Sequence, residues 1–428
     1  MPSLAHLPRV RGVSTKADQA LLRRLFATAV RVADPMLRVP DALPPRPKGR
    51  VVVIGAGKAS ARMAEAVASV WDDCEGLVIT RYGYGRSAAG IEIVEAAHPV
   101  PDAAGAAATA RLLDLLASLG PDDFVLSLIS GGGSALLVAP AGAVTLAEKQ
   151  AVNAALLASG APIDQMNVVR KHLSRVKGGQ LAAAAFPARM LCLMISDVPG
   201  DDPAAIASGP TVGSNSNCAD ARAILDNYGI NVPESVADVL RGETAVRRVD
   251  DPALSRVDNQ IIAAPSQSLA AAAEAAGDAG IAVEILGDAL EGEARELAAE
   301  HAALALSRQQ KLAPGAALLL LSGGECTVTR RGDGVGGPNA EYALALALAL
   351  DGAAGITALA GDTDGVDGAA EVAGAVFGPD ILADRSAARA ALDRNDAHNF
   401  FAGCNAQVVT GPTLTNVNDF RAILIRAI

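Results

Sequence analysis

Eight short motifs rich in glycine, aspartate, serine and threonine stand out in the sequence, and most of them directly follow an apolar run. Glycine lets backbone N–H groups approach an anion closely, and ligands of open α/β sheets bind beyond the carboxyl ends of the strands. One such motif alone would be an ordinary turn, but eight in one chain predict a ligand site. The motifs are GAGKA (55–59), SGGGSA (130–135), SDVPGDD (196–202), SGPT (208–211), SGGE (322–325), GVGGPN (334–339), GDTDGVDG (361–368) and GPTLTNVND (411–419).

The GAGKA motif places Lys58 where a helix is expected to begin, after the glycines Gly55 and Gly57. The positive end of a helix dipole disfavours a lysine, so its presence suggests that it neutralises an anion held by backbone N–H groups. The motif is not a Walker loop, because it lacks the GxxxxGK[ST] spacing. It is also an incomplete dinucleotide fingerprint, because Ser60 replaces the third glycine and no acidic residue follows the next strand.

The SGGGSA motif supplies three consecutive glycines after a second apolar run. Such a sequence lets backbone N–H groups wrap an oxyanion or a phosphate. A flexible turn without a ligand is the alternative. The glycines are Gly131, Gly132 and Gly133, and the hydroxyls of Ser130 and Ser134 are further candidate donors.

Two motifs carry aspartates among glycines after predicted strands. Such carboxylates suit a hard cation, and Mg²⁺ is preferred over Zn²⁺ because no histidine or cysteine accompanies them. Asx-turns or helix caps are the alternative. The aspartates are Asp197, Asp201 and Asp202 in the first motif and Asp362, Asp364 and Asp367 in the second.

Residues 168–181 form a densely basic segment in an otherwise acidic protein. Helical spacing would put Arg170, Lys171 and Lys177 along one side, where they could bind a substrate carboxylate or a nucleotide phosphate. Surface salt bridges are the alternative. The isolated histidines are expected to be structural, so no Ser-His-Asp triad is assigned. They are His6, His98, His301 and His398.

Apolar strands alternate with helices through the first half of the chain. This alternation indicates a parallel sheet covered on both faces, and we expect a doubly wound, Rossmann-like α/β domain. The expected strands are 51–55, 76–80, 91–96, 123–130 and 189–196, and the expected helices are 17–33, 57–70, 102–118 and 145–159.

The alternation weakens over residues 213–258, which we interpret as an inter-domain region. It resumes with an apolar run at 260–265 and indicates a second α/β domain. We therefore expect an N-terminal Rossmann-like domain over 1–250 and a C-terminal α/β domain over 251–428. Further expected strands are 281–286, 317–323 and 355–361, and further helices are 291–308 and 339–351.

Composition excludes several classes of protein. Of 428 residues, 51% are hydrophobic and 19% charged, which excludes a disordered chain. The net charge of −11 and the 3% of aromatic residues argue against nucleic acid as a partner. The five cysteines form no CxxC pair, and neither a signal peptide nor a membrane-spanning run is visible, so we expect a cytoplasmic protein without a membrane partner.

Together the motifs resemble the glycerate 2-kinases whose C-terminal half is a MOFRL domain, a family in which some members are named hydroxypyruvate reductase. The matching stretches run in order from residue 51 to residue 419. They are VVVIGAGKAS, SLISGGGSALL, NVVRKHLSRVKGGQLA, ISDVPGDDPAAIASGPTV, LLLSGGECTV, GGPNAEYALALAL, ALAGDTDGVDG and VVTGPTLTNVND. The resemblance implies ATP-dependent phosphorylation of D-glycerate to 2-phosphoglycerate with Mg²⁺, in an active-site cleft between two α/β domains.

The resemblance and the motifs together yield a set of expected site residues. The expected catalytic residues are Lys58, Asp197 and Arg170. Lys58, Arg170 and Lys171 are expected to bind the substrate, and Asp197, Asp362 and Asp364 the metal. Expected contacts of ATP are Gly55, Gly57, Ser130, Gly131, Gly132, Gly133, Ser134, Glu325, Asn339, Thr413 and Asn416.

One position departs from the family pattern. Many members read GGRNQE where this chain reads GGPNAE, so Pro338 replaces an arginine often regarded as a second catalytic cation. That role would fall to Arg170 or Lys171. The alternatives to a kinase are an NAD(P)H-dependent hydroxypyruvate reductase and a non-catalytic sugar-acid binding protein. Glycerate is the expected small-molecule partner, and a homodimer is left open.

Overall fold

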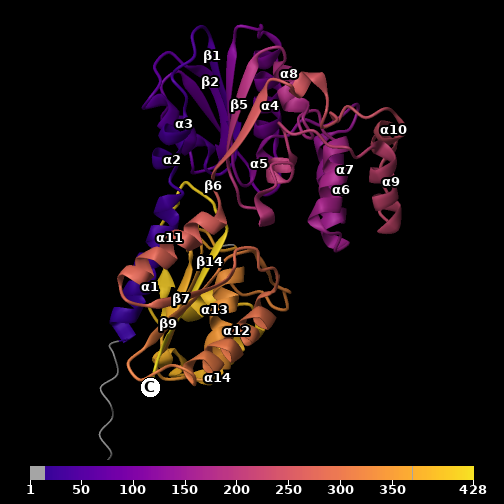
Figure 1. The fold of residues 1–428 in the computed structure, drawn as a ribbon. Coiled ribbons are helices and arrows are strands. Elements are labelled where there is room, and N and C mark those ends of the chain that lie inside the picture. Colours follow the sequence, from indigo (N-terminus) through magenta and orange to yellow (C-terminus); the bar gives the residue numbers. More distant parts are fainter. Residues whose placement is uncertain (1–14, 369) are drawn as a thin grey trace, which may run out of the picture. The chain divides into compact units, whose positions relative to one another are not determined.

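The computed structural model describes residues 15–368 and 370–428, which divide into two compact units (Figure 1). We call residues 32–264 with 414–417 the N-terminal unit, and the other described residues the C-terminal unit. This division differs from the expected domains 1–250 and 251–428, because it falls after Ala264 and assigns the first helix to the C-terminal unit. The histidine at position 6 lies outside the described residues.

Six parallel strands form the sheet of the N-terminal unit, in the order β3-β2-β1-β4-β5-β6. This is the strand order of a doubly wound dinucleotide-binding sheet, so the predicted Rossmann-like fold is confirmed. The order reverses between β1 and β4, the point at which such sheets bind ligands. The strands are β1 (Val51–Ala56), β2 (Glu75–Arg81), β3 (Ile91–Ala96), β4 (Phe124–Ile129), β5 (Arg189–Ile195) and β6 (Val257–Ala263).

Helices cover both faces of this sheet because the strands are apolar on both faces. Val51 and Val53 belong to the core under α2 and α3, whereas Val52 and Ile54 belong to the core under α4 and α8. These helices are α2 (Pro35–Ala42), α3 (Ser60–Ala68), α4 (Ala103–Ala117) and α8 (Gln180–Ala185).

Four more helices of the N-terminal unit pack on each other around a separate apolar cluster that includes Leu156, Val169, Leu225 and Leu240 (Figure 1). They are α6 (Leu146–Ala158), α7 (Ile163–His172), α9 (Cys218–Asn227) and α10 (Glu234–Arg241). The interpretation of residues 213–258 as an inter-domain region is therefore wrong, because α9 and α10 complete this helical cluster.

Two further expectations from the sequence are wrong. The apolar run at 260–265 does not open a second domain, because β6 pairs in parallel with β5 and completes the first sheet. The basic segment is not one helix, because α7 ends at His172 and the chain turns at Gly178 and Gly179, whose φ angles are +57° and +77°.

The C-terminal unit contains a second six-stranded sheet, in the order β13-β12-β11-β14-β9-β7. The expected α/β class is confirmed, but only the β7–β9 pair is parallel, since β14 enters between β9 and β11 and runs antiparallel to both. Its strands are β7 (Ala282–Gly287), β9 (Ala317–Ser322), β11 (Ile356–Asp362), β12 (Gly374–Phe377), β13 (Gln407–Val408) and β14 (Asp419–Arg426).

The second sheet is also covered on both faces. The helices α1 (Thr15–Val32) and α11 (Pro265–Asp278) pack on one core, and α12 (Ala294–Gln309), α13 (Pro338–Leu350), α14 (Arg385–Asp393) and α15 (Ala397–Gly403) on the other. The remaining short elements are α5 (Gly133–Leu136), β8 (Gly292–Glu293), β10 (Cys326–Thr327) and single 3₁₀ turns at Pro199–Asp201, Ile206–Ser208, Pro252–Leu254 and Pro379–Leu382. Within the described ranges no helix is both long and apolar enough to cross a membrane.

Phe26→Ala should destabilise the C-terminal unit, because Phe26 is buried and packs edge-to-face on Phe420 with ring centroids 5.7 Å apart. Removing such a side chain typically costs about 3–5 kcal/mol. Thermal unfolding should show a lower melting temperature for Phe26→Ala, and the exposed Arg24→Ala should change it little. Equal melting temperatures for both variants would contradict the packing of α1 described above.

Candidate active site

Two glycine-rich turns of the N-terminal unit are bonded to each other beyond the carboxyl ends of β1 and β4. The N–H of Lys58 donates to the carbonyl oxygen of Gly131 (2.8 Å), and the N–H of Ala59 donates to Ser130 Oγ (3.0 Å). Since β1 and β4 flank the point where the strand order reverses, both turns stand where a ligand is expected.

The GAGKA turn does not offer its own backbone to an anion. The N–H of Gly57 donates to the carbonyl oxygen of Ile79 (3.1 Å), and that of Ser60 donates to Gly57 (3.3 Å). The N–H groups of Lys58 and Ala59 are bonded to the neighbouring turn, as described above. A ligand of this turn would therefore meet the Lys58 side chain rather than a cradle of backbone amides.

Close packing explains the two glycines of this turn that we expected to contact ATP. A Cβ atom at Gly55 would lie 2.4 Å from the carbonyl oxygen of Leu128, and one at Gly57 would lie 2.1 Å from Ser130 Oγ. Both positions need glycine for these contacts alone, so neither requires a ligand.

The SGGGSA turn, in contrast, has backbone donors to offer. Across the described part of the chain, the N–H groups of Gly131 and Gly132 make no hydrogen bond, whereas that of Gly133 donates to the carbonyl oxygen of Ser130 (3.2 Å). Gly132 has a φ of +80°, the left-handed conformation found in anion-binding nests. This turn is the backbone oxyanion site that the structure supports.

Two polar side chains from distant parts of the sequence lie against Gly131. Asp197, directly after β5, accepts a hydrogen bond at Oδ2 from Asn416 Nδ2 (3.0 Å). A Cβ at Gly131 would lie 2.0 Å from that carboxylate oxygen and 2.6 Å from the amide nitrogen. The predicted residues Asp197 and Asn416 are therefore brought together with the glycine turn inside one unit.

Two further side chains lie against Gly132. A Cβ there would lie 2.9 Å from the His98 imidazole and 3.3 Å from Lys58 Cγ. Lys58 and His98 are both half-buried. The glycine turn is thus surrounded by an ammonium group, an imidazole and the Asp197 carboxylate, which is a set suited to binding and neutralising an anion.

The hydroxyls expected to bind ATP are already engaged. Ser134 Oγ lies 2.7 Å from Ser208 Oγ, and Ser208 Oγ donates to Asn167 Oδ1 (3.0 Å). Because each hydroxyl has one proton, Ser134 donates to Ser208 and can only accept from a ligand. Ser130 is fully buried and accepts from the Ala59 N–H. Both serines therefore shape the turn rather than supply donors.

Ala207 and Ser208 hold this arrangement at a cost in backbone strain. Their φ angles are +51° and +63°, a left-handed conformation that residues with a Cβ rarely adopt. Strain of this kind persists where the surroundings enforce it, and it clusters at functional sites.

A pocket of about 260 Å³ adjoins the glycine turn within the N-terminal unit. His98 and Gly132 line it from the side of the turn, and α6 and α7 supply most of the rest of its wall. Among its lining residues are the predicted Arg170 and Lys177, together with Lys149. Lys171 is not one of them; it is buried nearby, and burial lowers its pKa, which the charge of Asp202 partly offsets.

The aspartate motif of the C-terminal unit forms Asx-turns and a helix cap, which were the alternative to metal binding expected from the sequence. Asp362 Oδ1 accepts the N–H of Asp364, and Asp364 Oδ1 accepts the N–H of Val366, both at 2.8 Å. Asp367 accepts the N–H groups of Asn339 (3.0 Å) and Ala340 at the start of α13. Thr413 lies against the same turn, where its N–H donates to the carbonyl oxygen of Asp364 (3.1 Å).

The other predicted residues of the C-terminal unit are scattered. Asn339 is buried and donates from Nδ2 to Asp419 Oδ1 (2.6 Å), so its side chain serves the interior of the unit. Glu325 is exposed. Pro338 is the first residue of α13, a position that suits its fixed φ and its missing N–H.

Metal ligation is not concentrated in one acidic cluster. Among residues 15–368 and 370–428, no group of three or more histidine, cysteine, aspartate and glutamate side chains is arranged to hold a metal ion. Magnesium is commonly held by one or two carboxylates together with substrate phosphates, so a single carboxylate beside a phosphate site still fits it. Asp197 beside Gly131 meets that requirement.

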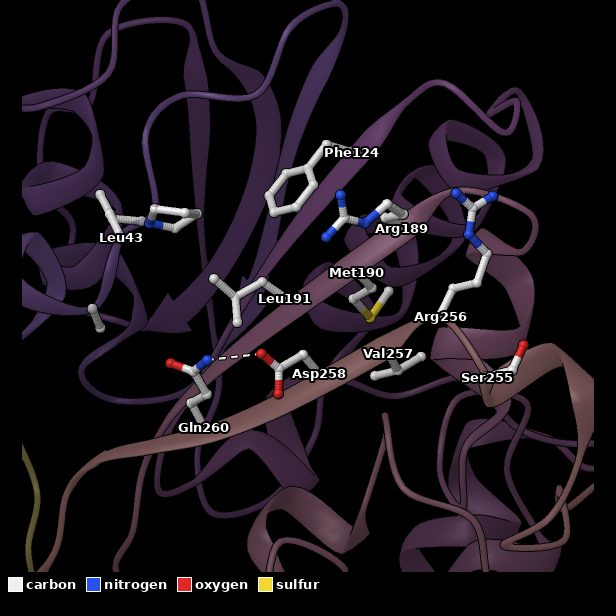
Figure 2. Close-up of a pocket in the computed structure, with 12 residues that line it drawn as sticks. Leu43, Phe124, Arg189, Met190, Leu191, Ser255, Arg256, Val257, Asp258 and Gln260 are labelled. Carbon is white, nitrogen blue, oxygen red and sulfur yellow. Dashed lines mark hydrogen bonds between the residues drawn. The ribbon is translucent and has the colours of Figure 1, made fainter.

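A second cavity of the N-terminal unit, of about 630 Å³, lies at the amino ends of β4, β5 and β6 (Figure 2). Figure 2 shows Arg189 and Arg256 on its wall and the hydrogen bond from Gln260 to Asp258. None of the predicted site residues lines it. Ligands of parallel α/β sheets bind at the opposite, carboxyl ends of the strands.

The sequence did not reveal Lys149 or Asn167, and His98 was set aside as structural. Lys149 stands in a helix whose one other charged residue, Glu148, belongs to an ordinary capping box, and the packing of α6 on α7 buries the lysine. His98 follows β3, so the end of a strand was the one available signal for it.

The chain matches two family models. A domain of unknown function, DUF4147, matches residues 21–241, and the MOFRL family matches residues 318–419. The second match confirms the predicted resemblance in the C-terminal half.

Named relatives match over nearly the whole chain. A protein of Agrobacterium vitis named "Putative hydroxypyruvate reductase" is 54% identical over 95% of this chain and 94% of its own. The D-glycerate 2-kinase of Thermotoga maritima is 38% identical over 91% of this chain and 94% of its own. The crystal structure of a glycerate kinase from Thermotoga maritima superposes with a TM-score of 0.85 at 37% identity, covering 96% of this chain and 100% of that one. Proteins named glycerate 2-kinase and hydroxypyruvate reductase are thus similar to this chain over nearly its whole length. The chain therefore belongs to the family that combines a DUF4147 domain with a MOFRL domain.

Proposed function

We propose that this chain is an ATP-dependent glycerate 2-kinase, which phosphorylates D-glycerate to 2-phosphoglycerate with Mg²⁺. The observation that carries the proposal is the Gly131–Gly132 turn, whose two N–H groups make no hydrogen bond within the described chain and around which Lys58, Asp197 and His98 gather. Relatives named glycerate 2-kinase and glycerate kinase support it.

To catalyse phosphoryl transfer, a protein mainly has to position the reactants and neutralise the charge of the phosphoryl group. The 2-hydroxyl oxygen bonds to the γ-phosphorus while the bond from that phosphorus to ADP breaks, and the hydroxyl proton is released. The turn and the Lys58 ammonium would stabilise the charge that spreads over the phosphoryl oxygens. Asp197 would hold Mg²⁺, which supplies further neutralisation of the nucleotide phosphates.

Hydroxypyruvate reduction is the second candidate, because relatives of 52–54% identity carry that name. A doubly wound reductase holds the cofactor pyrophosphate on the N–H groups that follow β1. Here the N–H groups of Gly57, Lys58, Ala59 and Ser60 are all bonded within the protein. This turn therefore lacks the donors that an NAD(P)H pyrophosphate needs, which favours the kinase.

Incubation with ATP, Mg²⁺ and D-glycerate should form 2-phosphoglycerate, detected by phosphorus NMR. A parallel incubation with NADPH and hydroxypyruvate, followed by absorbance, should show no oxidation of the cofactor. Exclusive formation of 3-phosphoglycerate would refute the assigned acceptor hydroxyl. NADPH oxidation without ATP turnover would replace the kinase by the reductase.

Lys58→Ala should lower kcat about a hundredfold or more, because one cation at a developing phosphoryl charge is worth on the order of 3 kcal/mol. Its melting temperature should stay close to that of the parent, since the half-buried ammonium packs into no apolar core. Steady-state kinetics and thermal unfolding measure the two effects, with the exposed Lys48→Ala as the matched control. A Lys58→Ala enzyme with parental kcat would place the cation outside the reaction.

Asp197→Asn should raise the Mg²⁺ concentration needed for half-maximal activity, because the metal loses a charged ligand of almost unchanged shape. Asp364→Asn is the comparison, since its carboxylate already caps the turn of Val366. If excess Mg²⁺ restores the activity of Asp197→Asn, the carboxylate binds the metal; if not, it accepts the hydroxyl proton instead. A shift in Asp364→Asn alone would move the metal site to the C-terminal unit.

A further inference from the structure

The pocket beside the glycine turn gathers three cations and no acid. Lys149 and Lys177 are 8% and 1% exposed, and Arg170 is half-buried. None of the residues that line the pocket is an aspartate or a glutamate. Buried charges in proteins are normally paired, because removing an unpaired ion from water is strongly unfavourable. Three basic side chains that pair with no acid in the described part of the chain indicate that a ligand supplies the negative charge that would keep them protonated.

Neutral dipoles, rather than carboxylates, hold these cations in place. Lys149 Nζ donates to the carbonyl oxygen of Leu173 (2.6 Å). Lys177 Nζ donates to the carbonyl oxygens of Ser134 (3.0 Å), Leu137 (3.3 Å) and Ala207 (3.5 Å), which uses all three of its N–H donors. Arg170 Nε donates to Asn153 Oδ1 (2.7 Å). These contacts fix the positions of the basic groups without supplying a negative charge, which is the arrangement expected of a preorganised anion site.

The remaining wall favours a small organic anion over a nucleotide triphosphate. The side chains of Val152, Leu156, Val169 and Leu173 form an apolar surface beside the cations. A cavity of about 260 Å³ with such a wall suits a carboxylate that carries a short carbon chain, but not a hydrated triphosphate with its metal. Gly132 lines the same pocket, so the rest of the acid would extend toward the proposed phosphoryl site.

We propose that Lys149, together with Arg170, binds the carboxylate of the hydroxy acid that accepts the phosphoryl group, with Lys177 behind them as a further basic group that makes no direct bond to it. This inference rests on the proposed kinase function and adds to it a binding residue, Lys149, that the sequence did not indicate. Arg170 supplies a planar fork that matches a carboxylate, and Lys149, which keeps N–H donors beyond the one bonded to Leu173, supplies a point charge.

The protonation state of Lys149 gives the proposal an independent signature. Burial, with a smaller contribution from Arg170, lowers the pKa of Lys149 to about 7, and burial lowers the pKa of Lys177 well below its usual value. A bound carboxylate favours the ammonium form, so binding should be accompanied by proton uptake. The charged or titratable groups around Lys149 are Arg170 from α7, Lys177 from the turn before α8 and His98 from the turn after β3. Glu148 on its own helix is half-buried and bonded to Thr145.

Titration calorimetry of Lys149→Met with D-glycerate tests the proposal, with and without a non-hydrolysable ATP analogue. The Kd for glycerate should rise at least about tenfold, as expected for a lost charge-assisted contact. The Kd for the ATP analogue should stay within about twofold by the same reasoning. Lys311→Met, at an exposed lysine, is the matched control and should change neither value.

Proton uptake distinguishes a binding role from a structural one. At pH 8, titrations in two buffers of different ionisation enthalpy should reveal proton uptake by the parent protein and less by Lys149→Met. For a group with a pKa of about 7 that must be protonated to bind, raising the pH from 7 to 8.5 should weaken glycerate binding about tenfold. Lys149→Met should lose much of this pH dependence.

The melting temperature of Lys149→Met without ligand should be equal to or above that of the parent, because a buried cation without an acidic partner is removed. An unchanged Kd for glycerate would overturn the proposal. So would weaker binding of the ATP analogue alone, which would make the anion a phosphate, or a parent protein that binds no glycerate. A parent protein that binds glycerate with proton uptake but forms no phosphorylated product would refute the kinase and leave the pocket assignment intact.

Discussion

The candidate site depends on two adjacent backbone positions at which no side-chain atom fits. At Gly131 the space of a Cβ is taken by Asp197 and Asn416, and at Gly132 by His98 and Lys58. Polar groups from four separate segments can approach one turn only because that turn is bare backbone. The strand order serves the same end, since it places β4 between β1 and β5, whose following turns carry Lys58 and Asp197.

The elements of the fold could largely be predicted, because apolar periodicity reports which residues are buried. Val51 to Ile54 are apolar in succession, and the structure covers both faces of that strand. Periodicity does not report which partner buries an element. Residues 213–258 were therefore separated from α6 and α7, and β6 was assigned to the wrong sheet, although each contains apolar residues that the sequence shows plainly.

The candidate site was predictable only where a residue type conflicts with its local surroundings. A lysine such as Lys58 is unfavourable at the start of a helix, and three successive glycines are unusual in an ordinary turn. Both features therefore predicted a ligand site. Gly55 and Gly57 were also predicted to contact a ligand, but close packing alone requires glycine at both positions. Nothing in the sequence marks Lys149 as a site residue, because a lysine is common within a helix such as α6 and is buried only when α7 packs over it. The electrostatic cost of burying a lysine arises from tertiary packing, so the local sequence does not reveal it.

The interleaving of the two units has a consequence for how the protein is synthesised. The chain passes between the units after residues 31, 264, 413 and 417, so neither unit is one continuous stretch of the gene. Domains generally fold as units while the ribosome extends the chain from its N-terminus. Here α1 leaves the ribosome long before the strands of its own unit, and Asn416 is synthesised 219 residues after its partner Asp197. A chain that ends between residues 264 and 415 contains every strand of the parallel sheet but lacks Asn416, so the polar set against Gly131 would be incomplete.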